Sequence, residues 1–214
     1  MTYVPEQFEQ QDPQQIEAFL TSDPFGTIIV NLNGELWPTP SPLIWRRADE
    51  GWGTFIAHVA IKNHMWKADP DQDVLVIVQG PNTYISPNWY STKAETHEVV
   101  PTWNYVSIHA WGKMTVHHDP KFKRMAVGML TKIHEASNNR PWKMGDAPQD
   151  FLIDQLEHIV GLEITIDRLK AKWKLNQNRK DADRAGVISG LANRATGDDA
   201  LIRELMIAKD VDAR

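Results

Sequence analysis

Alternation of apolar and polar residues dominates the chain and predicts β-strands. Residues 27–32 place three aliphatic side chains on one face, and residues 162–167 repeat this pattern most cleanly. A period of two is expected for a strand with one buried face. Residues 102–116 alternate over a greater length, and residues 51–58 form a further strand. Residues 74–78, Val-Leu-Val-Ile-Val, are continuously apolar, which predicts a strand buried on both faces.

A hairpin turn follows the first strand at Asn33-Gly34, and a partner strand is predicted over residues 36–45. This dipeptide is the strongest short hairpin signal, because both turn positions need a positive φ. The partner strand contains Pro38, Pro40 and Pro42, and each proline lacks a backbone N–H. Since the prolines are two residues apart, the missing donors lie along one edge. The strand is therefore predicted to lie at a sheet edge or to face a ligand.

Capping signals and helical spacing predict helices between and after the strands. Asp12-Pro13 opens the first helix, which Asp23-Pro24-Phe25-Gly26 terminates. Asp119-Pro120 opens another, in which apolar residues recur at helical spacing: Phe122, Met125, Met129 and Ile133. The other predicted helical segments are 63–67, 148–156, 181–194 and 198–208, the last two separated by a turn at Ala195–Gly197. Within the first of that pair, the spacing of Gly186 and Gly190 indicates close packing.

The order of these elements predicts an α+β fold, mainly β: an antiparallel barrel with flanking helices. We place the barrel domain at residues 1–178 and a C-terminal helical extension at 179–214. The 214 residues, 42% apolar and 24% charged, have an ordinary globular composition, and the lack of cysteine excludes disulfides and thiolate metal sites. Without an apolar run of about 20 residues or a signal-peptide pattern, the chain is expected to be cytoplasmic and free of membrane segments.

The charge balance argues against direct binding to nucleic acid. Lys and Arg total 23 and Asp and Glu total 28, giving a net charge of −5, whereas phosphate-binding proteins usually have a basic surplus. The two C-terminal helices, joined by a glycine turn, invite comparison with a helix-turn-helix. The second of them has a net charge of −2 over residues 198–210, which is unfavourable for a recognition helix. We expect it to pack onto the barrel or a partner subunit.

The eight histidines do not form a metal-binding pattern. His117 and His118 are adjacent on a strand and point to opposite faces, so they cannot share a metal ion. His58 and His64 lack a clear carboxylate third ligand. No metal ligand set is therefore expected, although haem ligation stays open because a single histidine in an apolar pocket suffices.

Lys62 and Asn63 follow a predicted strand and precede a helical turn. A cation and an amide beside a helix N-terminus are suited to a phosphate group. The alternative is a solvated lysine and an asparagine that caps the helical turn. Local sequence leaves both interpretations open.

Several longer blocks resemble the PaiB-like family, whose members are described as FMN-binding negative transcriptional regulators. The resemblance spans residues 3–191 in the expected order, and its blocks are long and include tryptophans. The blocks are Asp23-Pro-Phe-Gly-Thr27, Gln79-Gly-Pro-Asn-Thr-Tyr-Ile-Ser-Pro-Asn-Trp-Tyr90, Val100-Pro-Thr-Trp-Asn-Tyr105, Lys174-Leu-Asn-Gln-Asn-Arg179 and Asp183-Arg-Ala-Gly-Val-Ile-Ser-Gly-Leu191.

This resemblance implies the FMN-binding split barrel related to pyridoxamine-phosphate oxidases, a homodimer and two flavin sites at the subunit interface. It implies that Lys62 and Asn63 hold the FMN phosphate, although many such proteins have two basic residues there. The proline-rich strand would run along the isoalloxazine ring, so that Thr39 and Ser41 offer hydroxyls. His58 is also expected to be a cofactor-binding residue.

The resemblance also brings in two pairs, Trp103-Asn104 and Gln177-Asn178. They would close the site from the second subunit, by stacking and by amide contacts to the ring, or else serve the core and the strand ends. Three functions follow: a PaiB-type regulatory flavoprotein, an FMN-dependent oxidoreductase resembling flavin reductases or pyridoxamine-phosphate oxidase, and a haem-binding split barrel. His58 and His109 are the candidate acid–base residues for the second, and no catalytic residue is assigned. DNA binding is implied by the resemblance but disfavoured by the charge.

Overall fold

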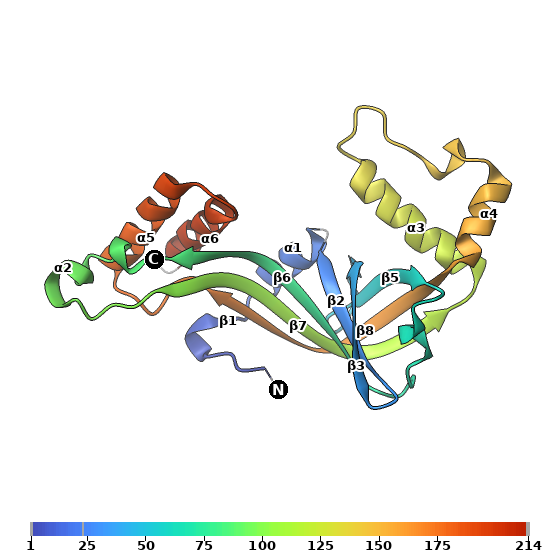
Figure 1. Ribbon diagram of the computed structural model, residues 1–214, viewed down its shortest axis with the longest axis horizontal. Helices are drawn as coiled ribbons and strands as arrows, with labels where there is room; N and C mark the ends of the chain where they lie inside the picture. Colours follow the sequence, from blue (N-terminus) through green and yellow to red (C-terminus); the bar gives the residue numbers. More distant parts are fainter. Residues whose placement is uncertain (1, 23, 213–214) are drawn as a thin grey trace. The chain divides into compact units, whose positions relative to one another are not determined.

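The computed structural model describes residues 2–22 and 24–212, with backbone only from residue 210 onward; Asp23 of the predicted helix-ending segment lies outside the described residues. Within them lie eight strands and six α-helices (Figure 1). The strands are β1 (Glu9–Gln10), β2 (Phe25–Leu32), β3 (Glu35–Pro42), β4 (Ile44–Arg46), β5 (Thr54–Ala60), β6 (Val74–Ile85), β7 (Thr102–His117) and β8 (Ile159–Lys174). The helices are α1 (Pro13–Thr21), α2 (Thr92–Thr96), α3 (Pro120–Glu135), α4 (Gln149–Glu157), α5 (Asp181–Arg194) and α6 (Asp199–Asp212).

The strands form one sheet in the order β3-β2-β6-β7-β8-β5-β4, and β1 pairs with β8. Strand pairs β1–β8, β2–β3, β2–β6, β4–β5 and β5–β8 all run antiparallel. The predicted antiparallel, mixed α+β architecture is confirmed.

The β2–β3 hairpin forms as predicted. Asn33 and Gly34 have φ values of 55° and 89°, which are the positive angles that a two-residue hairpin turn needs. Strand β3 pairs only with β2 and lies at the end of the sheet. Its three prolines stand opposite Ile29, Thr27 and Phe25 of β2. The backbone N–H groups that they lack are tolerated because β3, as an edge strand, has only one neighbouring strand.

Two compact units are present, and the first comprises residues 12–78 and 109–169. Here α3 covers Ile44 and Ile56 with its buried Ala126 and Leu130, while Phe122, Met125 and Met129 lie partly buried beside them. Of the four apolar residues predicted to share helical spacing, Ile133 is 40% exposed, because the last turn of α3 extends past this cluster. Leu75 and Ile77 of β6 are only partly buried, so the prediction of a strand buried on both faces was wrong.

The second unit comprises residues 1–11, 79–108 and 170–214. Its helices α5 and α6 pack together, and the backbone of α5 lies directly against Trp89. A Cβ on Gly190 would come within 2.3 Å of the Trp89 ring, and one on Gly186 within 2.0 Å of the Trp89 carbonyl oxygen. The close packing predicted from these two glycines is confirmed. The predicted boundary at residues 178 and 179 stays a prediction.

An ion pair fixes the start of α6 in the same unit. Asp199 is completely buried and accepts hydrogen bonds from Arg194 Nε at 2.7 Å and Thr83 Oγ1 at 2.6 Å. The Arg194 guanidinium holds the pKa of the Asp199 carboxyl well below its usual range, despite burial. Asp199 of α6 therefore stabilises the folded chain, which agrees with the expectation that this helix packs within the protein.

Gly190→Ala is expected to destabilise the protein by about 1–3 kcal/mol, because the new methyl group overlaps the Trp89 ring. The helix propensity of alanine offsets about 1 kcal/mol of that loss. Urea unfolding measures the effect. Gly145→Ala is the matched control, since its Cβ meets no atom within 4 Å. Equal stability of the two variants would contradict the packing role of Gly190.

Candidate functional site

The nine predicted site residues divide between the two units. Five belong to residues 12–78, and four belong to the unit that contains residues 79–108 and 170–214. The first group is Thr39, Ser41, His58, Lys62 and Asn63, and the second is Trp103, Asn104, Gln177 and Asn178.

The Asn63 side chain connects the edge strand β3 to the 3-10 helix η2 (His64–Lys67). Its Oδ1 accepts hydrogen bonds from Trp37 Nε1 at 3.0 Å and from the Met65 N–H at 3.2 Å. Its Nδ2 donates to Thr39 Oγ1 at 3.1 Å. The capping role is therefore confirmed, and the same amide brings Thr39 into the group. Because Thr39 Oγ1 accepts this bond, its own O–H remains able to donate.

Lys62 and Ser41 differ in what they offer a ligand. Lys62 is exposed and makes no ion pair with any described residue, so its ammonium is available to an anion. Ser41 is buried at 2% exposure, and its hydroxyl donates to the Pro42 carbonyl oxygen at 3.1 Å. In this group, Lys62 supplies the charge and Thr39 the free hydroxyl donor.

His58 lies on β5 directly opposite Gly161 of β8. A Cβ on Gly161 would come within 2.5 Å of the Phe122 ring, so this face of the sheet is covered by α3. The Nδ1 atom of His58 is buried without a hydrogen-bond partner. Burial lowers the pKa of His58, because the charged imidazolium is poorly solvated there. His58 is therefore a neutral imidazole near pH 7.

Trp103 and Asn104 have opposite surroundings on β7. Trp103 is 48% exposed, donates from Nε1 to Asn82 Oδ1 at 3.0 Å, and lies edge-on to the Tyr84 ring. Asn104 is completely buried, and its Nδ2 lies 3.6 Å from the sulfur of Met206 in α6. Its Oδ1 has no partner. Trp103 is thus accessible to a flat ligand, whereas a ligand contact by Asn104 would need α6 to move.

Gln177 and Asn178 stand between β8 and α5. The side chain of Gln177 accepts from the Leu175 N–H at 2.7 Å and donates to the Trp173 carbonyl oxygen, so both ends of the amide serve the turn. Asn178 is exposed. Their contacts to a flavin stay predictions.

A flavin mononucleotide needs a cation for its phosphate, a flat surface for its ring and donors for the ring's polar edge. Within residues 12–78, Lys62 offers a cation and Thr39 a hydroxyl, and the other unit separately presents the exposed Trp103 ring. The residues present are thus chemically suited to FMN. Neither of two cavities found on the chain is lined by any of the nine predicted residues.

Sequence reasoning missed two features of the structure. Trp37 joins the Asn63 group through its indole N–H, and its only sequence signal was its position in the proline-rich strand. A cavity between α3 and the following loop was also missed, because that loop has no periodic pattern. Among residues 2–22 and 24–212, no helix combines the length and apolar character needed to cross a membrane.

His58→Gln is expected to weaken the pH dependence of stability. The folded-state pKa of His58 lies below its usual value of about 6.5, so the wild-type protein loses stability as the pH falls below that value and the unfolded chain takes up the proton. Unfolding free energies at pH 7.5 and 5.5 measure this loss. It should be smaller in His58→Gln and unchanged in His64→Gln, which alters an exposed histidine. An identical loss in His58→Gln would show that burial of His58 is not its cause.

Solved structures with a similar fold include two proteins of low sequence identity. The flavocytochrome Anf3 from Azotobacter vinelandii is 17% identical with a TM-score of 0.58, over 86% of this chain and 78% of that one. The FAD and haem binding protein from Mycobacterium smegmatis is 15% identical with a TM-score of 0.54, over 83% and 78%. These similarities establish the split-barrel fold.

Sequence relatives cover nearly the whole chain. The protease synthase and sporulation protein PAI 2 of Bacillus subtilis (strain 168) is 32% identical over 205 residues, which are 95% of this chain and 96% of that protein. An uncharacterised protein of Emericella nidulans is 28% identical over 85% of this chain and 86% of its own. The family model FMN_bind_2, described as "Putative FMN-binding domain", matches residues 2–168. The chain therefore belongs to this PaiB-like family of FMN-binding proteins, and FMN is the cofactor that membership assigns to it.

Proposed function

We propose that this protein is a regulatory flavoprotein of the PaiB type that binds FMN at the interface of a homodimer. The observation that carries the proposal is the exposed, unpaired ammonium of Lys62 beside the Asn63 group on the edge strand β3. A charge-assisted contact from an ammonium to a phosphate is stronger than a neutral hydrogen bond. Lys62 would thus fix the phosphate end of the cofactor.

The edge strand determines how the flavin ring would be held. Because Pro38, Pro40 and Pro42 lack backbone N–H groups, β3 offers few backbone donors to a ligand. Side chains must then supply them, and the Thr39 hydroxyl is available since it accepts its bond from Asn63. FMN, when bound, accepts and donates electrons through its ring; Thr39 would orient that ring, and Lys62 would hold its phosphate.

A second copy of the chain would complete the site. Neither of the two cavities described above is lined by the predicted residues, and Trp103 presents its ring to solvent. An exposed tryptophan can stack on a flat ligand or pack in an interface. We infer that Trp103 closes the flavin site of the partner subunit, with Asn104, Gln177 and Asn178 supporting the strand and turn on which it depends.

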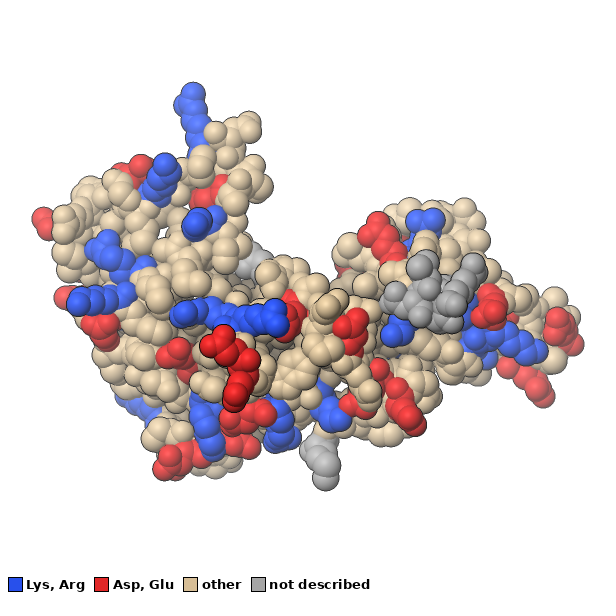
Figure 2. Space-filling model, turned by 180° about the vertical axis from the view of Figure 1, so that it is seen from behind, with Lys and Arg blue, Asp and Glu red and all other residues tan. Residues whose placement is uncertain are grey.

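Regulation would act through a partner protein and not through direct contact with DNA. Figure 2 shows acidic and basic side chains intermixed over one face of the molecule, without a large basic area on that face. The net charge of −5 and the structural use of Asp199 in α6 also argue against a recognition helix. A cytoplasmic location follows from this proposal.

Haem binding is a second candidate, and the unpaired ring nitrogen of His58 favours it. Two proteins of similar fold are named for haem as well as flavin. Phe122 covers the face on which His58 lies, so a haem would have to displace α3. An absorbance spectrum after adding hemin tests this candidate, since ligation by His58 would give a sharp Soret band that His58→Gln loses. An FMN-dependent oxidoreductase remains the alternative within the flavin proposal, with His109 as its other candidate acid–base residue.

Lys62→Ala is expected to weaken FMN binding about tenfold or more, because a hydrogen bond to a charged group contributes about 1.5–3 kcal/mol. Riboflavin, which lacks the phosphate, should bind the variant and the wild-type protein equally. Quenching of flavin fluorescence measures both affinities. Lys67→Ala is the matched control, because it removes the same charge from the other end of η2.

Equal losses for FMN and riboflavin would reject the phosphate role of Lys62. The dimer is tested separately by sedimentation of the pure protein with and without FMN. A monomer that binds no flavin at any excess would overturn the proposed function as a whole.

A further inference from the structure

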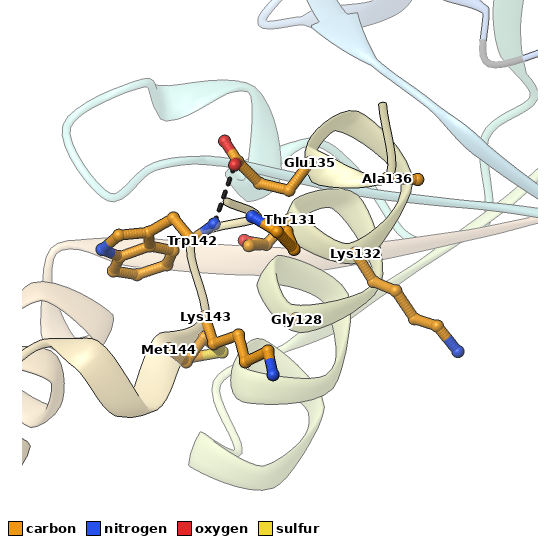
Figure 3. Close-up of a pocket in the computed structure, with 9 residues that line it drawn as sticks. Gly128, Thr131, Lys132, Glu135, Ala136, Trp142, Lys143 and Met144 are labelled. Atoms are coloured by element: carbon orange, nitrogen blue, oxygen red, sulfur yellow. Dashed lines mark hydrogen bonds between the residues drawn. The ribbon is translucent and has the colours of Figure 1, made fainter. Parts of the chain in front are cut away.

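A cavity, which we call the α3 cavity, lies between α3 and the loop that follows it (Figure 3). Its volume is about 480 Å³, within the range of about 300–1,000 Å³ typical of small-molecule sites. Gly128, Thr131 and Ala136 line it from the helix side, and Trp142, Lys143 and Met144 line it from the loop side. None of the residues assigned to the flavin belongs to this lining.

The walls of the α3 cavity are largely apolar and include an exposed aromatic ring. Trp142 is 43% exposed, whereas tryptophan side chains are on average highly buried. Gly128 has no side chain, so the Met144 sulfur comes close to the helix, where a Cβ on Gly128 would lie only 3.4 Å from it. The cavity volume and the exposed indole, not the helix surface at Gly128, give room for a flat ring beside the loop.

The acidic group of the α3 cavity is already engaged within the protein. Glu135 Oε2 accepts hydrogen bonds from the Trp142 N–H at 2.9 Å and from Asn138 Nδ2 at 2.8 Å. These two donors lower the pKa of Glu135. Its Oε2 attaches the loop to the end of α3, as the dashed line in Figure 3 indicates.

Two polar groups at the α3 cavity remain available. Figure 3 shows the Thr131 hydroxyl pointing toward Trp142, and Lys143 reaching from the loop toward the helix near Gly128. Neither the hydroxyl nor the ammonium has a partner in the described part of the chain. Lys132 lines the same region, but its side chain extends away from the loop. The edge of the cavity therefore has one exposed cation, Lys143, and one half-buried hydroxyl, Thr131.

We propose that the α3 cavity is a binding site for a small planar aromatic carboxylate. The ring would lie against the Trp142 indole and the Met144 thioether, and the carboxylate would accept hydrogen bonds from Lys143 Nζ and Thr131 Oγ1. An aromatic ring against an indole gains contact area and favourable stacking, and a carboxylate is the natural partner of an unpaired ammonium. This site is separate from the flavin site and does not depend on it.

The test uses 2-naphthoate as the probe and 2-naphthalenemethanol as its neutral counterpart, both titrated into the FMN-saturated protein by calorimetry. We expect saturable binding of 2-naphthoate, about tenfold tighter than that of the alcohol, as expected for a charged hydrogen bond. Lys143→Gln should remove this preference. Lys132→Gln makes the same change in net charge, but at a side chain that extends away from the loop. It should leave the preference for 2-naphthoate over the alcohol intact.

Two further variants keep the proposal falsifiable if Lys143→Gln or Lys132→Gln fails to fold. Trp142→Ala removes an exposed ring, so it should leave thermal unfolding nearly unchanged and weaken 2-naphthoate binding about tenfold. Lys62→Ala should not affect 2-naphthoate, which separates this result from failure of the flavin proposal. Absence of saturable binding, tighter binding of the cation 2-naphthylmethylammonium, or equal losses in Lys132→Gln and Lys143→Gln would each overturn the proposal.

Discussion

Backbone hydrogen bonding is the constraint on which the candidate flavin site depends. Three prolines at alternate positions deprive β3 of donors along one edge, so the strand can satisfy only one neighbour and must end the sheet. An unpaired strand edge normally invites further pairing, and proline prevents this. The edge is thus kept free of another strand, and of its two hydroxyls only that of Thr39 keeps a donor hydrogen for a ligand, because Ser41 donates to Pro42.

The Asn63 amide turns that edge into a defined local structure. One side chain satisfies the first turn of η2, the indole of Trp37 and the hydroxyl of Thr39. The two interpretations of the sequence, a cap or a ligand contact, therefore do not exclude each other. An amide that caps a turn also positions the neighbouring hydroxyl, and the adjacent Lys62 stays free because capping requires no charge.

The alternation along a strand explains why adjacent residues of one motif have different surroundings. Trp103 and Asn104 were predicted as a pair, yet successive side chains on β7 point to opposite faces. Trp103 therefore reaches solvent, and Asn104 lies beneath Met206. A sequence block shows which residues occur together, but only the register of the sheet decides which of them a ligand can contact.

The sequence by itself determined the local elements, because their causes are local. The Asn33-Gly34 turn, the Asp12 and Asp119 caps and the alternating strands all depend on residues within a few positions of one another. The α+β class and the family followed from these elements and from the long blocks. Tertiary structure decided the burial of His58 under α3, the hydrogen bond of Thr83 with Asp199 and the cavity beside Trp142. Each of these requires residues on different elements to meet, and no periodicity within one element encodes such a meeting.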